Sequence, residues 1–185
     1  MGITAAIINA GLGDLSLGLE MSGIKVVAAY ETDKRAIEIH KTNLDVPIYP
    51  LSSSEIDIKE FPQVDLLSAR LYLPLFSRAM SIPQKDCDPA AHILREILKE
   101  HKPRAFFLLA NSSAKQGSQF QEFLREIAGY EYQFQWKVIS VGQTLGVPVN
   151  ECMVCVVGTL RETRGLVHFA EHRYLPSMPP ESYYF

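Results

Sequence analysis

Two glycines and one glutamate lie at a spacing that can bind a nucleoside. Gly11 and Gly13 follow the apolar residues 3–8, and a missing side chain lets the backbone turn sharply against a ligand. Glu31 follows Gly11 by about twenty residues, the interval at which an acid accepts ribose hydroxyls in dinucleotide-binding folds. The pattern predicts a cofactor site formed by Ala10, Gly11, Leu12, Gly13, Glu31 and Thr32.

Two neighbouring residues favour a single nucleoside over a dinucleotide. The third glycine of the dinucleotide pattern falls on Ser16. Asp14 places a carboxylate at the N-terminus of the following helix, where it would repel a pyrophosphate. S-adenosylmethionine needs the two glycines and the acid but has no pyrophosphate, so the turn favours S-adenosylmethionine over NAD.

The glycine turn is expected to join a strand to a helix. Residues 3–8 and 25–30 have the short apolar runs of strands buried on both faces, and the second run ends at Glu31. The helix between them is expected to end at Gly23. Its apolar side is expected to consist of Leu15, Leu17, Leu19 and Met21.

The rest of the chain alternates helices with strands. Apolar periodicity predicts helices over residues 34–43, 89–102 and 117–128, and strands over residues 64–69, 105–109, 132–141 and 152–160. A hairpin from the last strand to residues 166–170 is expected, and residues 70–87 are expected to form a long loop. The alternation predicts one α/β domain over residues 1–170, with a doubly wound, mostly parallel sheet and an antiparallel C-terminal hairpin. Residues 171–185 are expected to form an extended arm.

The composition of the chain limits the number of domains and the kinds of partner that can be expected. The chain has 185 residues, 47% of them hydrophobic, which fits one domain with a sizeable core. Its 18 basic and 21 acidic residues leave no broad positive field, so DNA is expected to be contacted only indirectly or weakly. No apolar run is long enough to span a membrane and no export signal is evident, so we expect a cytoplasmic protein without a membrane partner.

The cysteines do not form a reactive constellation. Cys152 and Cys155 lie three residues apart in a predicted strand, so they point to opposite faces and cannot hold a metal together. Cys87 lies in a proline-rich stretch, and the nearest histidine, His92, falls on a predicted helix where a solvated role is expected, so Cys87 is a poor candidate for a nucleophile. We therefore expect reduced cysteines and no metal.

Several segments, in chain order, resemble the cytosine-5 DNA methyltransferases. NAGLGDLSLGLEMSG resembles the family's FAGIGGLSLGLE, and YETD resembles its second motif, in which an acid binds the cofactor ribose. VDLLSARLYLPLFSRA aligns with the catalytic loop VDLLIGGPPCQGFSRA, and KPRAFFLLANS with the strand that usually ends in Glu-Asn-Val. GVPVNECMVCVVG resembles GVPQNRERVFIVG. The resemblance implies a Rossmann-like, S-adenosylmethionine-dependent methyltransferase fold.

The same alignment implies that the catalytic groups are missing. The family uses a cysteine thiolate to attack cytosine, a glutamate to bind its ring, and a Gln-x-Arg-x-Arg segment that orders the loop. Leu73 stands at the cysteine position and Ala110 at the glutamate position. The glutamine and the two arginines are replaced by Val149, Glu151 and Met153. The family's target-recognition domain has no counterpart in the sequence.

The resemblance and its departures leave three functions open. The first is a catalytically inactive regulatory or structural partner of an active methyltransferase or other DNA-modifying complex, or a homo-oligomer. The second is one subunit of a split cytosine-5 methyltransferase, and the third is an S-adenosylmethionine sensor. Because Asp14 and Ser52 replace the family's glycine and aspartate at the cofactor pocket, binding of S-adenosylmethionine or S-adenosylhomocysteine is expected to be weak.

Overall fold

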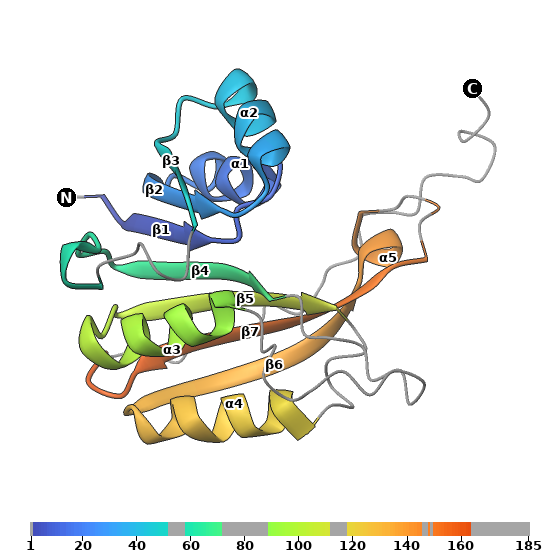
Figure 1. Ribbon diagram of the computed structural model, residues 1–185. Helices are drawn as coiled ribbons and strands as arrows, with labels where there is room; N and C mark the ends of the chain where they lie inside the picture. Colours follow the sequence, from blue (N-terminus) through green and yellow to red (C-terminus); the bar gives the residue numbers. More distant parts are fainter. Residues whose placement is uncertain are drawn as a thin grey trace, which may run out of the picture.

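A seven-stranded mixed sheet forms the centre of the protein (Figure 1). The computed structural model describes residues 2–51, 58–71, 89–111, 118–145, 148 and 150–163. The strand order is β3-β2-β1-β4-β5-β7-β6. Strands β1 to β5 run parallel, and β7 lies antiparallel between β5 and β6. The strands are β1 (Thr4–Ile8), β2 (Lys25–Glu31), β3 (Ile48–Pro50), β4 (Leu66–Leu71), β5 (Ala105–Asn111), β6 (Tyr132–Ser140) and β7 (Cys152–Leu160).

Helices cover the two faces of the sheet unequally. Helices α1 (Asp14–Met21) and α2 (Lys34–Asn43) pack on one face, over β1, β2 and β3. Helices α3 (Pro89–Glu100) and α4 (Ser118–Gly129) pack on the other face, over β4, β5, β7 and β6. A 3₁₀ turn η1 (Ile58–Glu60) and the short helix α5 (Val141–Leu145) complete the described elements. The predicted doubly wound, mostly parallel α/β fold with an antiparallel C-terminal pair is confirmed.

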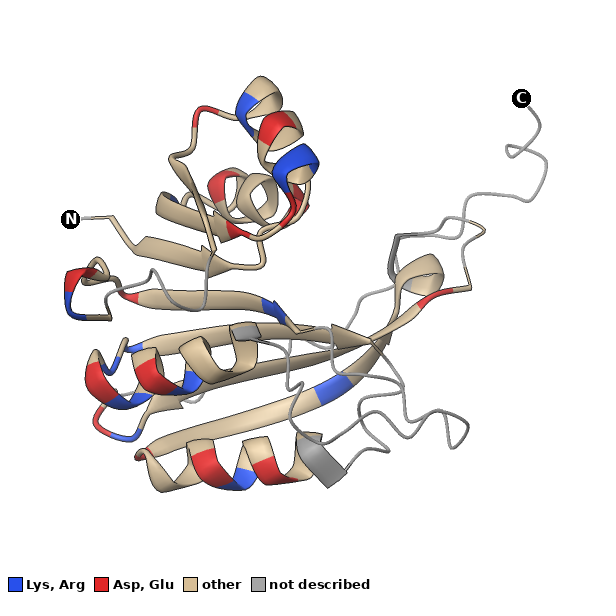
Figure 2. Cartoon of the chain, in the orientation of Figure 1, with Lys and Arg blue, Asp and Glu red and all other residues tan. Residues whose placement is uncertain are grey.

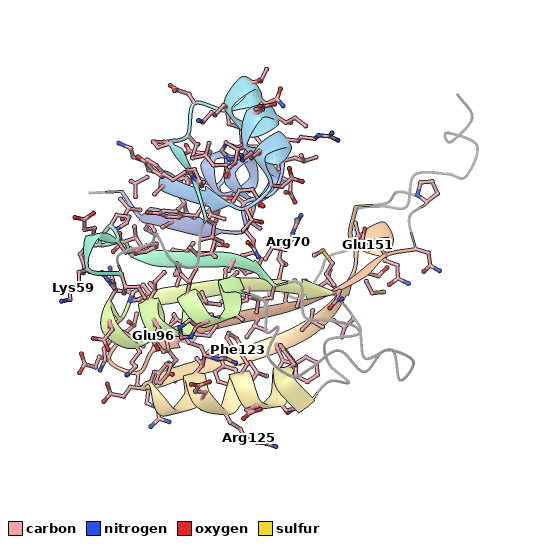
Figure 3. The ribbon with its side chains drawn as sticks, in the orientation of Figure 1. Lys59, Arg70, Glu96, Phe123, Arg125 and Glu151 are labelled. Atoms are coloured by element: carbon pink, nitrogen blue, oxygen red, sulfur yellow. The ribbon has the colours of Figure 1, made fainter. Side chains whose placement is uncertain are left out.

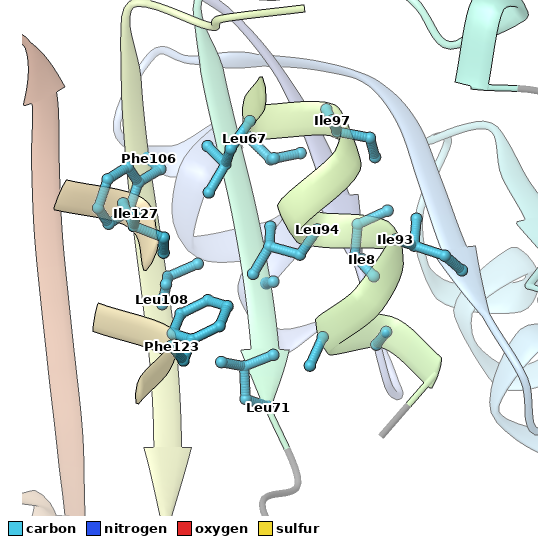
Figure 4. Packing of buried hydrophobic residues seen from close by; sticks show 14 of the residues in the cluster. Ile8, Leu67, Leu71, Ile93, Leu94, Ile97, Phe106, Leu108, Phe123 and Ile127 are labelled. Carbon is cyan, nitrogen blue, oxygen red and sulfur yellow. The ribbon is translucent and has the colours of Figure 1, made fainter. Parts of the chain in front are cut away.

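The larger hydrophobic core lies between the sheet and helices α3 and α4 (Figure 4). Apolar residues three and four apart place one side of each helix against the sheet. In α3 these include Leu94 and Ile97, and in α4 they include Phe123 and Ile127, all fully buried. The strands beneath contribute every second residue, among them Leu67, Phe106 and Leu108.

The buried side of α1 differs from the prediction. Leu15 and Ser16 are buried, whereas Leu17 is 48% exposed and Met21 is 80% exposed. Residues two positions apart lie about 200° apart around a helix, so alternating leucines cannot share one face. The predicted apolar side is therefore confirmed for Leu15 and Leu19, which pack in the core, and wrong for Leu17 and Met21.

The antiparallel pair at the C-terminal end consists of β6 and β7. The proposed partner strand at residues 166–170 lies outside the described residues, as do the arm over 171–185 and residues 72–88. Strand β7 is hydrogen-bonded to β5 on one edge and to β6 on the other. It has no free edge for a further strand, so the predicted pairing of residues 152–160 with 166–170 is wrong.

The end of β4 is the boundary that matters for the site. The sequence placed this strand at residues 64–69 and the following loop at 70–87, whereas β4 spans Leu66–Leu71. Its register with β5 pairs Arg70 with Leu109. Arg70 therefore belongs to the carboxyl end of a central strand, where ligands bind in such sheets. The short elements β3 and α5 were not predicted.

Candidate cofactor site

The glycine turn between β1 and α1 requires both of its glycines. Gly11 has φ 59° and Gly13 has φ 108°, which are left-handed conformations that side chains disfavour. A Cβ atom on Gly13 would lie 2.5 Å from Cδ1 of Leu44 and 3.0 Å from Cδ2 of His40. Gly13 therefore allows the start of α1 to pack against α2, and Gly11 faces the carboxyl end of the sheet.

The carboxylate of Glu31 is held by backbone N–H groups from two segments. The N–H of Gly11 donates to Oε2 at 2.7 Å. The N–H groups of Thr32 and Asp33 donate to Oε1 at 2.7 and 3.0 Å, and the Thr32 hydroxyl donates to Oε1 at 3.1 Å. Glu31 is only 6% exposed. Because a carboxylate oxygen accepts about two hydrogen bonds, Oε2 is the oxygen better placed to accept a ribose hydroxyl.

The structure brings together most of the predicted cofactor residues. Gly11, Glu31 and Thr32 are joined by the hydrogen bonds above. Ala10 is buried in the core, and its N–H donates to the carbonyl of Tyr30. Leu12 is 58% exposed. Ala10 and Leu12 thus contribute backbone to the turn, while Gly11 and Glu31 form the polar surface of the site. Ser52 lies outside the described residues.

An ion pair crosses the entrance to the glycine turn. The guanidinium of Arg70, on β4, pairs with the carboxylate of Asp14 at the start of α1, and Figure 3 labels Arg70 at the end of β4. Nη1 of Arg70 also lies 3.7 Å from the position that a Cβ on Gly11 would occupy. The predicted unpaired negative charge at Asp14 is therefore wrong, because Arg70 neutralises it.

Sequence reasoning missed Arg70 because it placed this residue in a loop. One signal was available, since VDLLSARLY puts an arginine where the resembled motif VDLLIGG has its second glycine. The same resemblance puts Asp14 at another glycine position. Arg70 and Asp14, which both replace glycines of the family, thus form an ion pair with each other.

A buried polar contact fixes α1 on α2 behind the turn. Oγ of Ser16 lies 2.9 Å from Nε2 of His40, and both side chains are fully buried. Burial lowers the pKa of His40, because the imidazolium would lose its hydration. Ser16 occupies the third glycine position of the dinucleotide pattern, and its hydroxyl serves helix packing here.

The described positions that align with the family's catalytic and loop-ordering groups are Ala110, Glu151 and Met153. Ala110 is 2% exposed within the main core, paired with Leu71 and Val154. Glu151 is exposed beside α5 (Figure 3), and its carbonyl accepts the N–H of Val141. Leu73, at the nucleophile position, lies outside the described residues. No ionisable side chain occupies position 110.

The two described cysteines occupy different environments in β7. Cys155 is buried, and burial raises the pKa of its thiol to about 11. Cys152 is half-buried. A thiol with so high a pKa is almost entirely protonated at neutral pH and is a poor nucleophile. Cys87 lies outside the described residues.

Charge is mixed over the described surface. Figure 2 shows lysine and arginine segments interspersed with aspartate and glutamate along α3 and α4. Within the part of the chain that the structure describes, no helix is both long and apolar enough to cross a membrane. The same residues contain no cluster of three or more metal-binding side chains.

Known methyltransferases are similar in sequence to most of this chain. The family model described as C-5 cytosine-specific DNA methylase matches residues 6–177. The type II methyltransferase M.HindV of Haemophilus influenzae is 25% identical over 174 residues, which cover 89% of this chain and 53% of the relative. The type II methyltransferase M.NlaX of Neisseria lactamica is 27% identical over 159 residues, or 82% and 50% of the two chains. This chain therefore spans about half the length of these relatives.

Solved structures agree on the fold. The S. pombe Dnmt2 methyltransferase superposes with a TM-score of 0.71 at 14% identity, covering 89% of this chain and 51% of that one. The Entamoeba histolytica methyltransferase EhMeth superposes with a TM-score of 0.70 at 16% identity, covering 94% and 58%. The sheet order, the glycine turn and the family match lead to one conclusion: the chain belongs to the C-5 cytosine-specific DNA methylase family.

Proposed function

We propose that this chain is a catalytically inactive member of the family that acts as a regulatory or structural partner of an active DNA-modifying enzyme. One observation carries the proposal: Ala110 takes the position of the family's ring-binding glutamate, and its methyl group lies in the apolar core. The alignment also places Leu73 at the nucleophile position. Neither side chain can attack C6 of cytosine or exchange a proton with the ring.

Retention of the fold without these groups supports a role through contacts. The seven-stranded sheet and the glycine turn are both present, so the surfaces through which such a fold makes contacts can form. The chain also spans about half the length of its curated relatives. Interaction with an active methyltransferase is therefore the proposed role.

The site retains part of the chemistry needed for S-adenosylmethionine. Oε2 of Glu31 can accept a ribose hydroxyl, and the Gly11 turn permits close approach of a ligand. The Arg70–Asp14 pair stands at the entrance to this turn, where the amino-acid end of the cofactor would have to compete with it. We therefore propose that S-adenosylmethionine or S-adenosylhomocysteine binds weakly. The bound cofactor would act as a ligand only, and its methyl group would not be transferred.

Two other functions have specific support. A split methyltransferase would explain the half-length match, because a second chain would carry the remainder. An S-adenosylmethionine sensor would explain the retained Gly11 and Glu31 contacts in the absence of catalytic groups. The split enzyme requires the partner to supply both the thiolate and the carboxyl group. The sensor requires no such additional groups, so it is the better supported of these two functions.

Affinity purification of the full chain at native expression, followed by reconstitution, tests the proposed role. The expected result is a recovered DNA-modifying enzyme whose activity or stability changes at least severalfold when this chain is added back. If methyl transfer requires both chains and neither acts alone, the split enzyme replaces the proposal. If the chain is recovered without any partner and leaves an active methyltransferase unchanged, the regulatory role is wrong.

A further inference from the structure

An apolar cavity lies on the sheet face that helices α1 and α2 leave uncovered. Its volume is about 490 Å³. Leu66 of β4, Phe107 of β5 and Val157 of β7 form its floor, and Leu19 and Ile24, at and just after the end of α1, form one wall. The cavity is at the amino ends of the parallel strands, whereas the glycine turn is at their carboxyl ends. It is therefore separate from the cofactor site.

The side chains that line this cavity are only partly covered. Leu66, Phe107 and Val157 are half-buried, although they belong to central strands. On the opposite face, Leu67 and Phe106 are fully buried beneath α3 and α4. Central strands of a parallel sheet are normally covered on both faces. The cavity thus marks a place on the sheet that lacks a covering segment among the described residues.

The chain leaves the sheet at the edge of this cavity. After β7, the N–H of Thr163 donates to the carbonyl of Leu160 at 2.9 Å, which closes a tight turn. The N–H of Arg161 donates to the carbonyl of Glu131 at 3.0 Å, so the turn is anchored to the residue that precedes β6. Thr163 itself lines the cavity. The next residue of the chain therefore starts at the cavity wall.

The residues that follow include several large apolar side chains. Residues 164–170 read RGLVHFA, and Leu166, Val167 and Phe169 supply large apolar side chains. Both edges of β7 are already paired, so these residues cannot extend the sheet beside it. Seven residues reach about 23 Å when extended, which is enough to cross a cavity that the chain already borders.

We propose that residues 164–170 of this chain dock in the cavity and cover the sheet from the same molecule. Leu166, Val167 and Phe169 provide the apolar surface, and Leu66, Phe107 and Val157 receive it. The paired charges of Arg104 and Asp65, 3.7 Å apart at the cavity wall, remain at the solvent side. The docked segment closes the amino-terminal end of the sheet and leaves the end with the glycine turn open to a ligand or partner.

Chemical cross-linking of the full chain tests this placement directly. Ile24→Cys and Phe169→Cys are combined, and a short bismaleimide is added at low protein concentration. The expected product is an intramolecular cross-link between positions 24 and 169, identified by peptide mapping of the monomer. Each single variant serves as the control for reaction with Cys87, Cys152 and Cys155. Cross-links found only between two molecules, or none between these positions, would overturn docking from the same chain.

Thermal unfolding provides a second, independent measurement. Leu166→Ser with Phe169→Ser removes two buried apolar side chains, which is expected to lower the unfolding midpoint by about 6–12 °C. Tyr184→Ser, which removes an aromatic side chain outside the segment, is the matched control and is expected to shift the midpoint by less than about 2 °C. Equal midpoints for the double variant and the unchanged chain would contradict the proposal, whatever the cross-linking yields.

Discussion

The guanidinium of Arg70 pairs with the carboxylate of Asp14 across the entrance to the glycine turn. Arg70 comes from the end of β4 and Asp14 from the first residue of α1, 56 residues apart in sequence. Asp14 is 58% exposed and Arg70 is 22% exposed, so solvent screens the pair. Its main consequence is for ligand binding, since any ligand at Gly11 meets a neutral pair in place of an isolated carboxylate.

Substitution of the two residues should change cofactor affinity in opposite directions. Asp14→Gly leaves the Arg70 cation available to the methionine carboxylate, and S-adenosylhomocysteine should bind about tenfold more tightly. Arg70→Gly leaves Asp14 unpaired, and the affinity should fall about as much. Isothermal titration calorimetry measures both.

A distant charge provides the control for these titrations. Glu122→Gln removes an exposed carboxylate on α4, on the opposite face of the sheet from α1, and should leave the affinity unchanged. Submicromolar binding of S-adenosylmethionine by the unchanged chain would contradict the proposed competition. The same conclusion would follow if both glycine substitutions strengthened binding equally, because charge would then be irrelevant.

Glu31 should matter for stability as well as for binding. Its carboxylate accepts three backbone N–H groups and one hydroxyl while almost fully buried. In Glu31→Gln an amide NH₂ replaces one acceptor oxygen and faces these donors. The free energy of unfolding should fall by about 1–3 kcal/mol, measured by urea denaturation. Glu38→Gln, on the exposed side of α2, is the matched control, and an equal effect of both substitutions would refute the role given to Glu31.

Acidification should destabilise the protein through His40. Its pKa is lowered in the folded state by burial, from the usual 6.5, so the unfolded chain binds the proton more readily. The contribution of neutral His40 to stability is complete above about pH 6.5 and is lost as pH falls through the folded-state pKa. His40→Gln keeps a neutral partner for Ser16 and should flatten the decline in unfolding midpoint between about pH 7 and 5. Parallel pH profiles for the two proteins would show that His40 is not responsible.

Gly158 should not tolerate even a methyl group. A Cβ at this position would lie 2.4 Å from the ring of Phe106 and 3.0 Å from Cβ of Phe134. Gly158→Ala must displace a fully buried aromatic ring, at a cost of about 1–3 kcal/mol. Gly129→Ala, where a Cβ meets no atom within 4 Å, is the control. Chemical denaturation of the two variants should separate them clearly, and similar midpoints would contradict the packing argument.

The sequence predicted the elements that depend on local pattern. Residues 34–43 and 152–160 were placed with the bounds that the structure has, because an amphipathic helix and a buried strand have clear periods. The glycine turn and Glu31 were found because their spacing reflects a fixed βαβ geometry.

What the sequence could not predict depends on contacts between distant segments. Asp14 could be identified as a charge in the site, but its pairing with Arg70 requires the register of β4 beside β1. The partners of β7 follow from strand order, which one sequence does not encode locally. In α1, alternating leucines obscured the true buried side, which includes the polar Ser16 because His40 lies opposite it.

The central claim is the absence of catalysis, and methyl transfer measures it most directly. The full chain is incubated with DNA and tritiated S-adenosylmethionine, with an active cytosine-5 methyltransferase as the positive control. Because Leu73 and Ala110 supply neither a thiolate nor a carboxyl group, incorporation should equal background, and Cys87→Ala should change nothing. Incorporation above background that disappears in Cys87→Ala would contradict the account, because it would identify a working nucleophile in this chain.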